Sequence, residues 1–217
     1  MAMDVAVAGG HGKIALRLLR LLAERGDRAR GLIRNPDHAP DLEAVGAVAV
    51  GADLENLDAD AIATSISGCD AVVFAAGAGP GSGAARKRTV DFGAAVKLID
   101  AAKLSGISRY LMVSAMGVRD PVARGEQMRP YYEAKLEADQ ALAASGLDYT
   151  IVRPGRLTDD PGTGLIEVAY GLERIGGIPR DDVAATLATC LDTENTIGKS
   201  FDLLGGETPI ADALAAL

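Results

Sequence analysis

Short apolar runs alternate with longer segments of helical periodicity along the chain. Residues 4–9 (DVAVAG) form a continuous apolar run, and in residues 13–26 (KIALRLLRLLAERG) apolar side chains recur every three or four positions. A short continuous run is typical of a strand buried on both faces, and the longer period predicts an amphipathic helix. Repeated strand–helix units predict right-handed crossovers and a parallel sheet.

The same pattern predicts about seven strands with helices between them. Gly26, Gly106 and Gly146 each follow a helical segment, at the C′ position that glycine favours. We therefore expect an α/β fold of the Rossmann type, with a doubly wound, mainly parallel sheet in the order 3-2-1-4-5-6-7 and helices on both faces. The expected strands lie at 4–9, 28–35, 47–53, 70–77, 108–117, 148–155 and, more weakly, 199–206.

Composition supports a single domain of this class. The chain has 217 residues, of which 48% are hydrophobic, and this is enough for one well-buried core. Aromatic residues make up 4% and Trp is absent, so the core must be built from Ala, Val, Leu and Ile, which suits buried parallel strands. The glycine-rich stretch 75–85 is too short for an interdomain linker and is predicted to be a loop after the fourth strand.

Charge and spacing exclude several classes of protein. The formal net charge is −8, and the basic cluster at 86–88 (RKR) is interpreted as a solvated helix face, so we expect no nucleic-acid partner. Cysteine and histidine lack metal-ligand spacing, and the acidic pairs at 159–160 and 181–182 are interpreted as turns and helix caps. Because we find neither a signal peptide nor an apolar run of bilayer length, we expect a cytoplasmic protein without a membrane partner.

The first strand–helix junction has the residues of a phosphate-binding loop. In VAVAGGHGKIALRLL, Gly9, Gly10 and Gly12 precede the helix and Ala15 lies in its first turn. Glycines allow a tight turn and let the backbone approach a pyrophosphate, which the helix N-terminus then stabilises. Tight turns also use glycine for backbone reasons alone, but this position, directly after a buried strand, favours a dinucleotide site.

The ends of the second and third strands bear on which dinucleotide binds. Arg34, in GLIRNP, occupies the place where an acidic residue would bind the ribose 2′-hydroxyl of NAD, and its guanidinium suits the 2′-phosphate of NADP. We therefore expect NADP(H) in preference to NAD(H), the alternative being an exposed loop arginine. Asp53, which ends the third strand, suits equally a hydrogen bond from the adenine amino group and a helix cap.

A second constellation lies in residues 129–139 (RPYYEAKLEAD). Tyr131 and Lys135 are four residues apart, which places them on one face of a helix. An ammonium beside a phenol favours the phenolate, so Tyr131 is a candidate acid/base group. The pair alone is a weak motif. It gains weight because Ser114 ends the preceding strand, where a hydroxyl can orient a substrate oxygen or close a turn.

Taken in order, these segments resemble a known family. The chain is similar to atypical short-chain dehydrogenase/reductases of the NAD(P)H-binding, NmrA-like group over most of residues 4–164. Ala15 replaces the family's third loop glycine, and the part after residue 155 is short, which argues against a large substrate. The matching segments are VAGGHGKIA, GLIRNP, DAVVFAAGAGPGSG, VDFGAAVKLIDAAK, RYLMVSAMG, YYEAK and LDYTIVRPGRLTDDPGTG, with IPRDDVAATL beyond them.

The resemblance implies a site and a domain plan. It implies Ser114, Tyr131 and Lys135 as the catalytic set, with Arg153 near the nicotinamide or in a structural ion pair, and Thr158 as a candidate substrate contact. Residues 1–217 are then a single NAD(P)-binding domain with a small substrate-side portion at about 155–180. The expected cofactor-binding residues are Gly9, Gly10, His11, Gly12, Lys13, Ile14, Arg34, Asp53, Leu54, Ala75, Ala76, Gly77, Pro154 and Gly155.

The first functional hypothesis is an NADP(H)-dependent oxidoreductase that transfers hydride to or from a small carbonyl, quinone or flavin-like substrate. The alternative, from a different class, is a redox sensor that binds NAD(P)H without turnover, as some NmrA-like relatives do. An epimerase or dehydratase acting on a nucleotide sugar ranks third because the C-terminal part is short. We expect a small-molecule substrate, and a monomer or homodimer.

Overall fold

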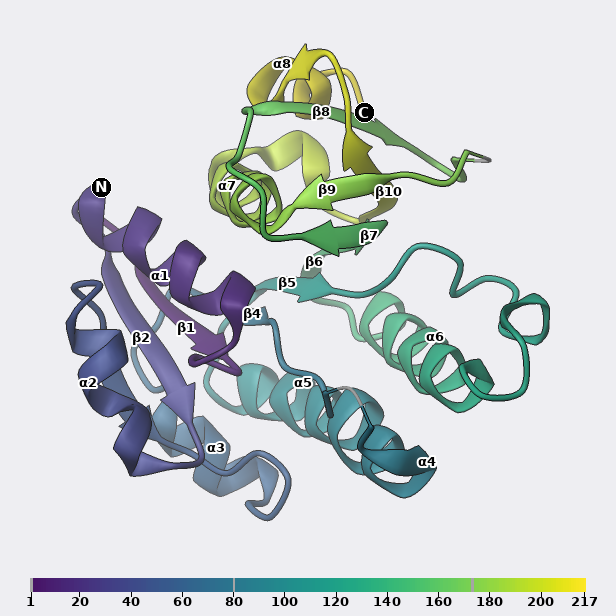
Figure 1. Ribbon diagram of the computed structural model, residues 1–217. Coiled ribbons are helices and arrows are strands. Elements are labelled where there is room, and N and C mark those ends of the chain that lie inside the picture. The colour runs from purple at the N-terminus through teal and green to yellow at the C-terminus, as the bar shows by residue number, and fades with distance from the viewer. Residues whose placement is uncertain (1, 80, 173) are drawn as a thin grey trace.

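The computed structural model of the protein describes residues 2–79, 81–172 and 174–217; Pro80, in the predicted glycine-rich loop, lies outside the described residues. The strands form one nine-stranded sheet in the order β11-β8-β10-β6-β5-β4-β1-β2-β3, and a separate pair, β7 and β9 (Figure 1). The strands are β1 (Asp4–Ala8), β2 (Arg28–Ile33), β3 (Val48–Gly51), β4 (Ala71–Phe74), β5 (Arg109–Val113), β6 (Asp148–Pro154), β7 (Arg156–Thr158), β8 (Leu165–Ala169), β9 (Gly177–Pro179), β10 (Lys199–Gly205) and β11 (Thr208–Pro209).

Helices connect these strands. Among the described residues, no helix has the combination of length and apolar character needed to cross a membrane. The α-helices are α1 (Lys13–Glu24), α2 (Ala39–Glu43), α3 (Ala59–Ser65), α4 (Gly83–Arg86), α5 (Ala95–Leu104), α6 (Arg129–Ala143), α7 (Arg180–Asp192) and α8 (Ile210–Ala215). The other helical segments are η1 (Pro36–His38), η2 (Lys87–Ala94), η3 (Val122–Arg124) and η4 (Glu194–Thr196).

The predicted strand order is confirmed from β3 through β6, and the predicted seventh strand is β10. These strands are parallel to their neighbours, as βαβ units require. The expected strand number was too low, because the main sheet has nine strands rather than about seven. β8 runs antiparallel to β10 and carries β11 at the sheet edge. These short, half-exposed edge strands lack the continuous apolar run by which the buried strands are recognised.

Each central strand contributes side chains to two separate cores. Along β1, Val5 and Val7 belong to a core that includes side chains of α1 and α7, whereas Ala6 and Ala8 belong to a core on the other face, with α3, α5 and α6. This alternation explains why every position from Val5 to Ala8 is apolar. Figure 1 shows the resulting three layers, with α1 packed beside α7 on one face of the sheet.

The long helix predicted after the fourth strand is not uniform. It consists of α4, the π-helical segment η2 and α5, which follow one another without a break. A π-helix inserts extra backbone into each turn and is frequently found at functional sites. In this protein, the π-helical segment carries Asp91, whose side chain is buried at the carboxyl ends of the strands. The sequence predicts the helix but not its change of pitch.

Candidate cofactor and active site

A pocket of about 320 Å³ lies at the carboxyl ends of β1, β2, β3 and β4, where the chain order of the sheet reverses. Ten predicted cofactor-binding residues line it: Gly9, Gly10, His11, Gly12, Arg34, Asp53, Leu54, Ala75, Ala76 and Gly77. The other lining residues are Leu32, Ile33, Asn35, His38, Ala52, Glu55, Arg86, Val90 and Ala94. The predicted residues Lys13, Ile14, Pro154 and Gly155 lie outside this lining.

The glycine loop packs closely against two neighbouring strand ends. A Cβ atom on Gly10 would lie 2.8 Å from the Cα atom of Gly31 in β2, and the Gly10 N–H donates to the Leu32 carbonyl at 2.9 Å. Gly9 adopts φ +76°, in the left-handed region. These glycines are therefore required for the fold of the loop. The pocket lies beside the start of α1, because Gly10, His11 and Gly12 line it directly before the helix. The N-terminus of a helix favours an anion, so this part of the pocket suits a phosphate.

The basic side chains at the start of α1 are paired with carboxylates. The Lys13 ammonium lies 2.6 Å from Asp159, which also accepts from Arg180 at 2.8 Å, and both cations hold the pKa of Asp159 below its usual range. The His11 ring lies 2.7 Å from Asp41 and stacks on His38 at 3.7 Å. Lys13 thus joins the phosphate loop to the loop after β7, while Ile14 is a core residue.

Arg34 shares a carboxylate with a second arginine that the sequence analysis missed. The Arg34 guanidinium lies 3.3 Å from Glu55, and Arg86 of α4 lies 3.6 Å from the same oxygen. The Thr89 hydroxyl donates to the other Glu55 oxygen at 2.6 Å. The interpretation of residues 86–88 as a solvated face was incomplete, because Arg86 lines the pocket. The sequence signal that could have indicated this role is the position of Arg86 directly after the glycine-rich loop at 75–85.

Asp53 lines the pocket and also stabilises a turn. Its carboxylate accepts the Glu55 N–H at 3.1 Å and the Asn56 side-chain amide at 2.8 Å. The helix cap of α3 is instead Asp58, which accepts the Ala61 N–H at 2.9 Å. Asp53 therefore fixes the loop that carries Glu55 into the pocket.

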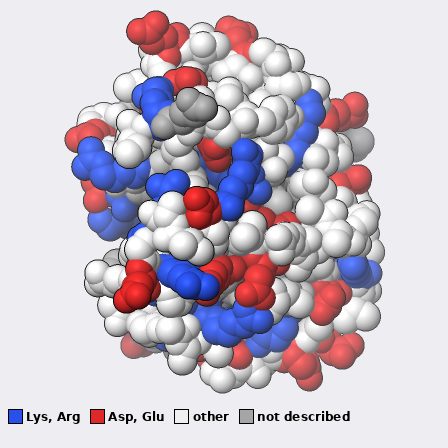
Figure 2. Space-filling model, turned by 90° about the vertical axis from the view of Figure 1, so that its right-hand side faces the viewer, with Lys and Arg blue, Asp and Glu red and all other residues white. Residues whose placement is uncertain are grey.

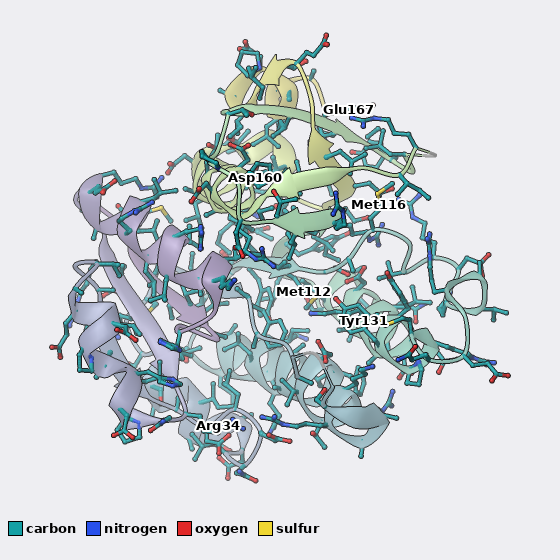
Figure 3. All side chains as sticks on the ribbon, in the orientation of Figure 1. Arg34, Met112, Met116, Tyr131, Asp160 and Glu167 are labelled. Carbon is teal, nitrogen blue, oxygen red and sulfur yellow. The ribbon has the colours of Figure 1, made fainter. Side chains whose placement is uncertain are left out.

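Lys135 connects the cofactor pocket with the predicted catalytic residues. Its buried ammonium lies 3.1 Å from the Val113 carbonyl, at the end of β5, and 3.4 Å from the carbonyl of Ala76, a pocket residue. Ser114 follows Val113 directly and is buried, and the Asp139 carboxylate of α6 lies close to its hydroxyl. In Figure 3, Tyr131 lies on α6 and Arg34 follows β2, well apart along the strand-end side of the molecule. This separation suits an extended dinucleotide.

Tyr131 is in a different electrostatic environment from the one predicted. Burial, followed by the negative charge of Asp91 and by Tyr132 and Asp139, raises the pKa of the Tyr131 phenol above its usual range. Lys135 was expected to favour the phenolate, but its ammonium is 3.4 Å from the Asp91 carboxylate. The acid/base role of Tyr131 stays a prediction, and the protonated phenol is able to donate a proton.

The RPG segment has structural partners. Arg153 donates to Asp139 at 2.9 Å, and both side chains are buried, in line with the ion-pair alternative for this arginine. Burial raises the pKa of Asp139, although Arg153 opposes the shift. Gly155 passes the residue before β9 so closely that a Cβ atom would lie 2.6 Å from the Gly176 carbonyl oxygen. This segment therefore packs against the β7–β9 pair.

The loop after β7 is held by capping interactions. Asp182, at the start of α7, accepts the Thr163 N–H at 3.0 Å and the Gly164 N–H at 2.8 Å. Asp181 pairs with Arg17 at 2.7 Å, and the Thr158 hydroxyl is buried without a hydrogen-bond partner in the described residues. Within residues 2–79, 81–172 and 174–217, no group of three or more His, Cys, Asp or Glu side chains is arranged to hold a metal ion.

Surface charge is mixed on the face turned toward the viewer in Figure 2. Lys and Arg side chains there are interspersed with Asp and Glu. A surface of this kind differs from the one-sign basic patch by which proteins bind a phosphate backbone. The absence of a nucleic-acid partner stays a prediction.

The fold, the glycine loop and the strand-end pocket define a Rossmann-type protein that binds a nicotinamide dinucleotide. The chain belongs to the NAD(P)H-binding family, whose model matches residues 9–194. This membership and the relatives below confirm the predicted resemblance to the atypical short-chain dehydrogenase/reductases.

Full-length relatives support the same assignment. The uncharacterized sugar epimerase YhfK of Bacillus subtilis (strain 168) is 45% identical over 216 residues, which cover 99% of this chain and 100% of YhfK. A solved structure from Bacillus halodurans, provisionally named an NAD-dependent epimerase/dehydratase, is 41% identical with a TM-score of 0.94 over 100% of both chains. The anaerobilin reductase ChuY of Escherichia coli O157:H7 is 25% identical with a TM-score of 0.77 over 93% of this chain and 97% of ChuY. The protein is accordingly an oxidoreductase-like NAD(P)H-binding enzyme.

Proposed function

We propose that this protein is an NADPH-dependent reductase of a small carbonyl, quinone or flavin-like compound, with Tyr131 as the proton donor. One observation carries the proposal: Lys135 contacts both the Ala76 carbonyl of the cofactor pocket and the Val113 carbonyl beside Ser114. The reacting part of a dinucleotide bound in the pocket would therefore meet Ser114 and Tyr131. The cofactor supplies hydride, and the protein must supply a proton and a binding site for the developing oxyanion.

The charges at the pocket mouth support NADPH over NADH. Arg34 and Arg86 converge on Glu55, so two guanidinium groups share one carboxylate there. A 2′-phosphate can accept hydrogen bonds from both arginines. Glu55 opposes this preference, and the balance between it and the two arginines determines how strongly the site discriminates.

The state of Tyr131 supports reduction over oxidation. A phenol whose pKa is raised by burial and by Asp91 stays protonated at neutral pH. It can then give its proton to an oxygen that gains negative charge as hydride arrives at the adjacent carbon. Ser114, buried at the end of β5, is placed to hold the same oxygen by a hydrogen bond. The relative ChuY is a reductase, which agrees with this direction.

The test is oxidation of NADPH with a panel of small carbonyls, quinones and free flavins, followed by the variant Tyr131→Phe. We expect turnover by the unaltered protein and a loss of about 10²- to 10⁴-fold in the variant, with NADPH affinity kept. Tyr132→Phe is the matched control, since the neighbouring phenol has no lysine four residues later. Equal activity of Tyr131→Phe and the unaltered protein would contradict the proton-donor role.

A non-catalytic NAD(P)H sensor is the second candidate. It is favoured by the pairing of Lys135 with Asp91, because this carboxylate competes with a phenolate for the ammonium. In that case NADPH binds, but no member of the acceptor panel is reduced. Epimerisation, which the names of two relatives suggest, would instead convert a nucleotide sugar without net consumption of cofactor.

A further inference from the structure

Asp91 is a buried carboxylate that neither the sequence motif nor the family comparison assigns. Its side chain is 1% exposed, and one oxygen lies 3.4 Å from the Lys135 ammonium. The other oxygen accepts the Ala78 N–H at 3.2 Å. Because a buried carboxylate is costly to desolvate, the charge requires a compensating partner, and Lys135 is that partner.

The surroundings of Asp91 place this ion pair beside the cofactor pocket. Asp91 belongs to the π-helical segment η2, and the same segment contributes Val90 to the pocket lining. A Cβ atom on Gly77, also a lining residue, would lie 3.1 Å from the Asp91 oxygen that faces Lys135. Glycine at position 77 therefore leaves room for the Asp91 carboxylate. The Asp91 oxygen that faces Lys135 has no hydrogen-bond partner within the described residues.

We propose that Asp91 is a positioning residue whose carboxylate holds the Lys135 ammonium at the ends of β4 and β5, beside the cofactor pocket. In this arrangement Lys135 acts as a donor to the bound cofactor, together with the carbonyl contacts that fix its direction. The catalytic consequence rests on the proposed reductase function. The positioning of Lys135 by Asp91 does not rest on that function, because its effects are on cofactor affinity and on the ionisation of Tyr131, which are measured without turnover.

The charges around Tyr131 show what Asp91 changes. Asp91 on η2 faces the phenol from the neighbouring helical segment, and Tyr132 and Asp139 face it from α6 itself. Asp139 is already paired with Arg153 from β6, and Arg124 from η3 lies over the Tyr132 ring. Asp91 is therefore the acidic group whose removal would both relieve repulsion of a phenolate and release Lys135. Both effects lower the pKa of Tyr131.

The experiment is a titration of the phenol by its near-ultraviolet phenolate absorbance in the unaltered protein and in Asp91→Asn. Asparagine has nearly the same shape and can still accept the Ala78 N–H, so the fold is expected to persist. Comparison with Tyr131→Phe and with the double variant assigns the Tyr131 signal among the five tyrosines. We expect the Tyr131 titration to move down by about one pH unit in Asp91→Asn. An unchanged titration would overturn the proposal.

Cofactor affinity gives an independent measurement. NADPH binding, followed by nicotinamide fluorescence, should weaken about tenfold in Asp91→Asn because Lys135 loses its fixed direction. In the background of Lys135→Met the same substitution should have little further effect on binding. Asp100→Asn, an exposed carboxylate on α5, is the matched control and should change neither measurement.

Two outcomes separate this proposal from the proposed reductase function. If no acceptor is reduced but the titration and affinity shift together, the reductase function fails and the role of Asp91 holds. Should Asp91→Asn unfold, Asp91→Glu keeps the charge and displaces the carboxylate, and it should weaken NADPH binding while leaving the phenol titration in place. Unchanged NADPH affinity in Asp91→Glu would then contradict the proposal.

Discussion

Gly9 and Ala76 approach so closely that a Cβ atom on Gly9 would lie 2.7 Å from the Ala76 Cα atom. The contact presses the phosphate loop against the chain that leaves β4. No side chain at position 9 can be accommodated unless one of these backbones moves. The pocket between them would then change shape.

Gly9→Ala should consequently lose both stability and cofactor binding. The substitution combines a left-handed φ of +76° with a backbone clash, and we expect a loss of about 2–4 kcal/mol in the free energy of unfolding. Gly68→Ala is the matched control, since its φ is +75° and its Cβ position is open. The control should lose only about 1 kcal/mol and bind NADPH normally. Urea denaturation and a binding titration check both, and equal losses would contradict the role of the contact.

Arg34→Ala should weaken NADPH binding by about ten- to a hundredfold and leave NADH binding nearly unchanged. The reason is that the guanidinium at the end of β2 would meet the 2′-phosphate, which NADH lacks. Glu55→Gln should have the opposite effect, tightening NADPH binding by several-fold, because both arginines then lose their internal carboxylate partner. Dissociation constants for the two cofactors decide between these outcomes. A parallel loss for NADH in Arg34→Ala would indicate a structural role instead.

Asp182→Ala should destabilise the protein by about 2–4 kcal/mol. Its buried carboxylate satisfies the N–H groups of Thr163 and Gly164, which would be left without a partner. Asp181→Ala removes the neighbouring carboxylate, which forms a partly exposed pair with Arg17 and should cost about 0–1 kcal/mol. Urea midpoints compare the two variants, and similar midpoints would show that the loop does not depend on this cap.

The thiols of Cys69 and Cys190 should react with iodoacetamide only after unfolding. Burial, assisted at Cys69 by Asp4, raises the pKa of each thiol from 9.0 to about 12. At about pH 8 the thiolate is then on the order of one part in ten thousand, and the rate should rise with pH. The folded state therefore keeps its full contribution from each thiol below about pH 9 and loses it as pH rises toward 12. Rapid native labelling would contradict these shifts.

The parallel core of the fold was predictable because its strands are buried on both faces. Ala71–Phe74 and Arg109–Val113 are entirely buried, so the apolar run is continuous through the first strand and from Tyr110 onward in the second. The strands between residues 156 and 179 were not predicted, since they are three to five residues long and partly exposed. β7 pairs with β9, and β8 pairs with β10, so the partners are separated by about 20 residues or more in the chain. A local pattern of apolar residues does not indicate such distant pairs.

The cofactor site was predictable to the extent that it is formed by strand ends. The glycine loop and Arg34 follow strands directly, and sequence order places them at the same edge of the sheet. Glu55, Arg86 and Asp91 were missed because their positions depend on loop and helix geometry. In particular, a π-helical turn changes which side of the helix Asp91 faces, and the helical period gives no sign of it.

The position of β10 has a consequence for how the chain assembles. β10 lies between β6 and β8, although both of these strands precede it in the chain. Until Lys199–Gly205 enters the sheet, β6 has an open edge and β8 has no neighbour on that side. The cofactor half, from β1 to β5, can pair as it emerges from the ribosome. The other half of the sheet is joined late, when β10 enters between β6 and β8, and a polypeptide shortened before Lys199 would leave the edge of β6 open to any other strand able to pair with it.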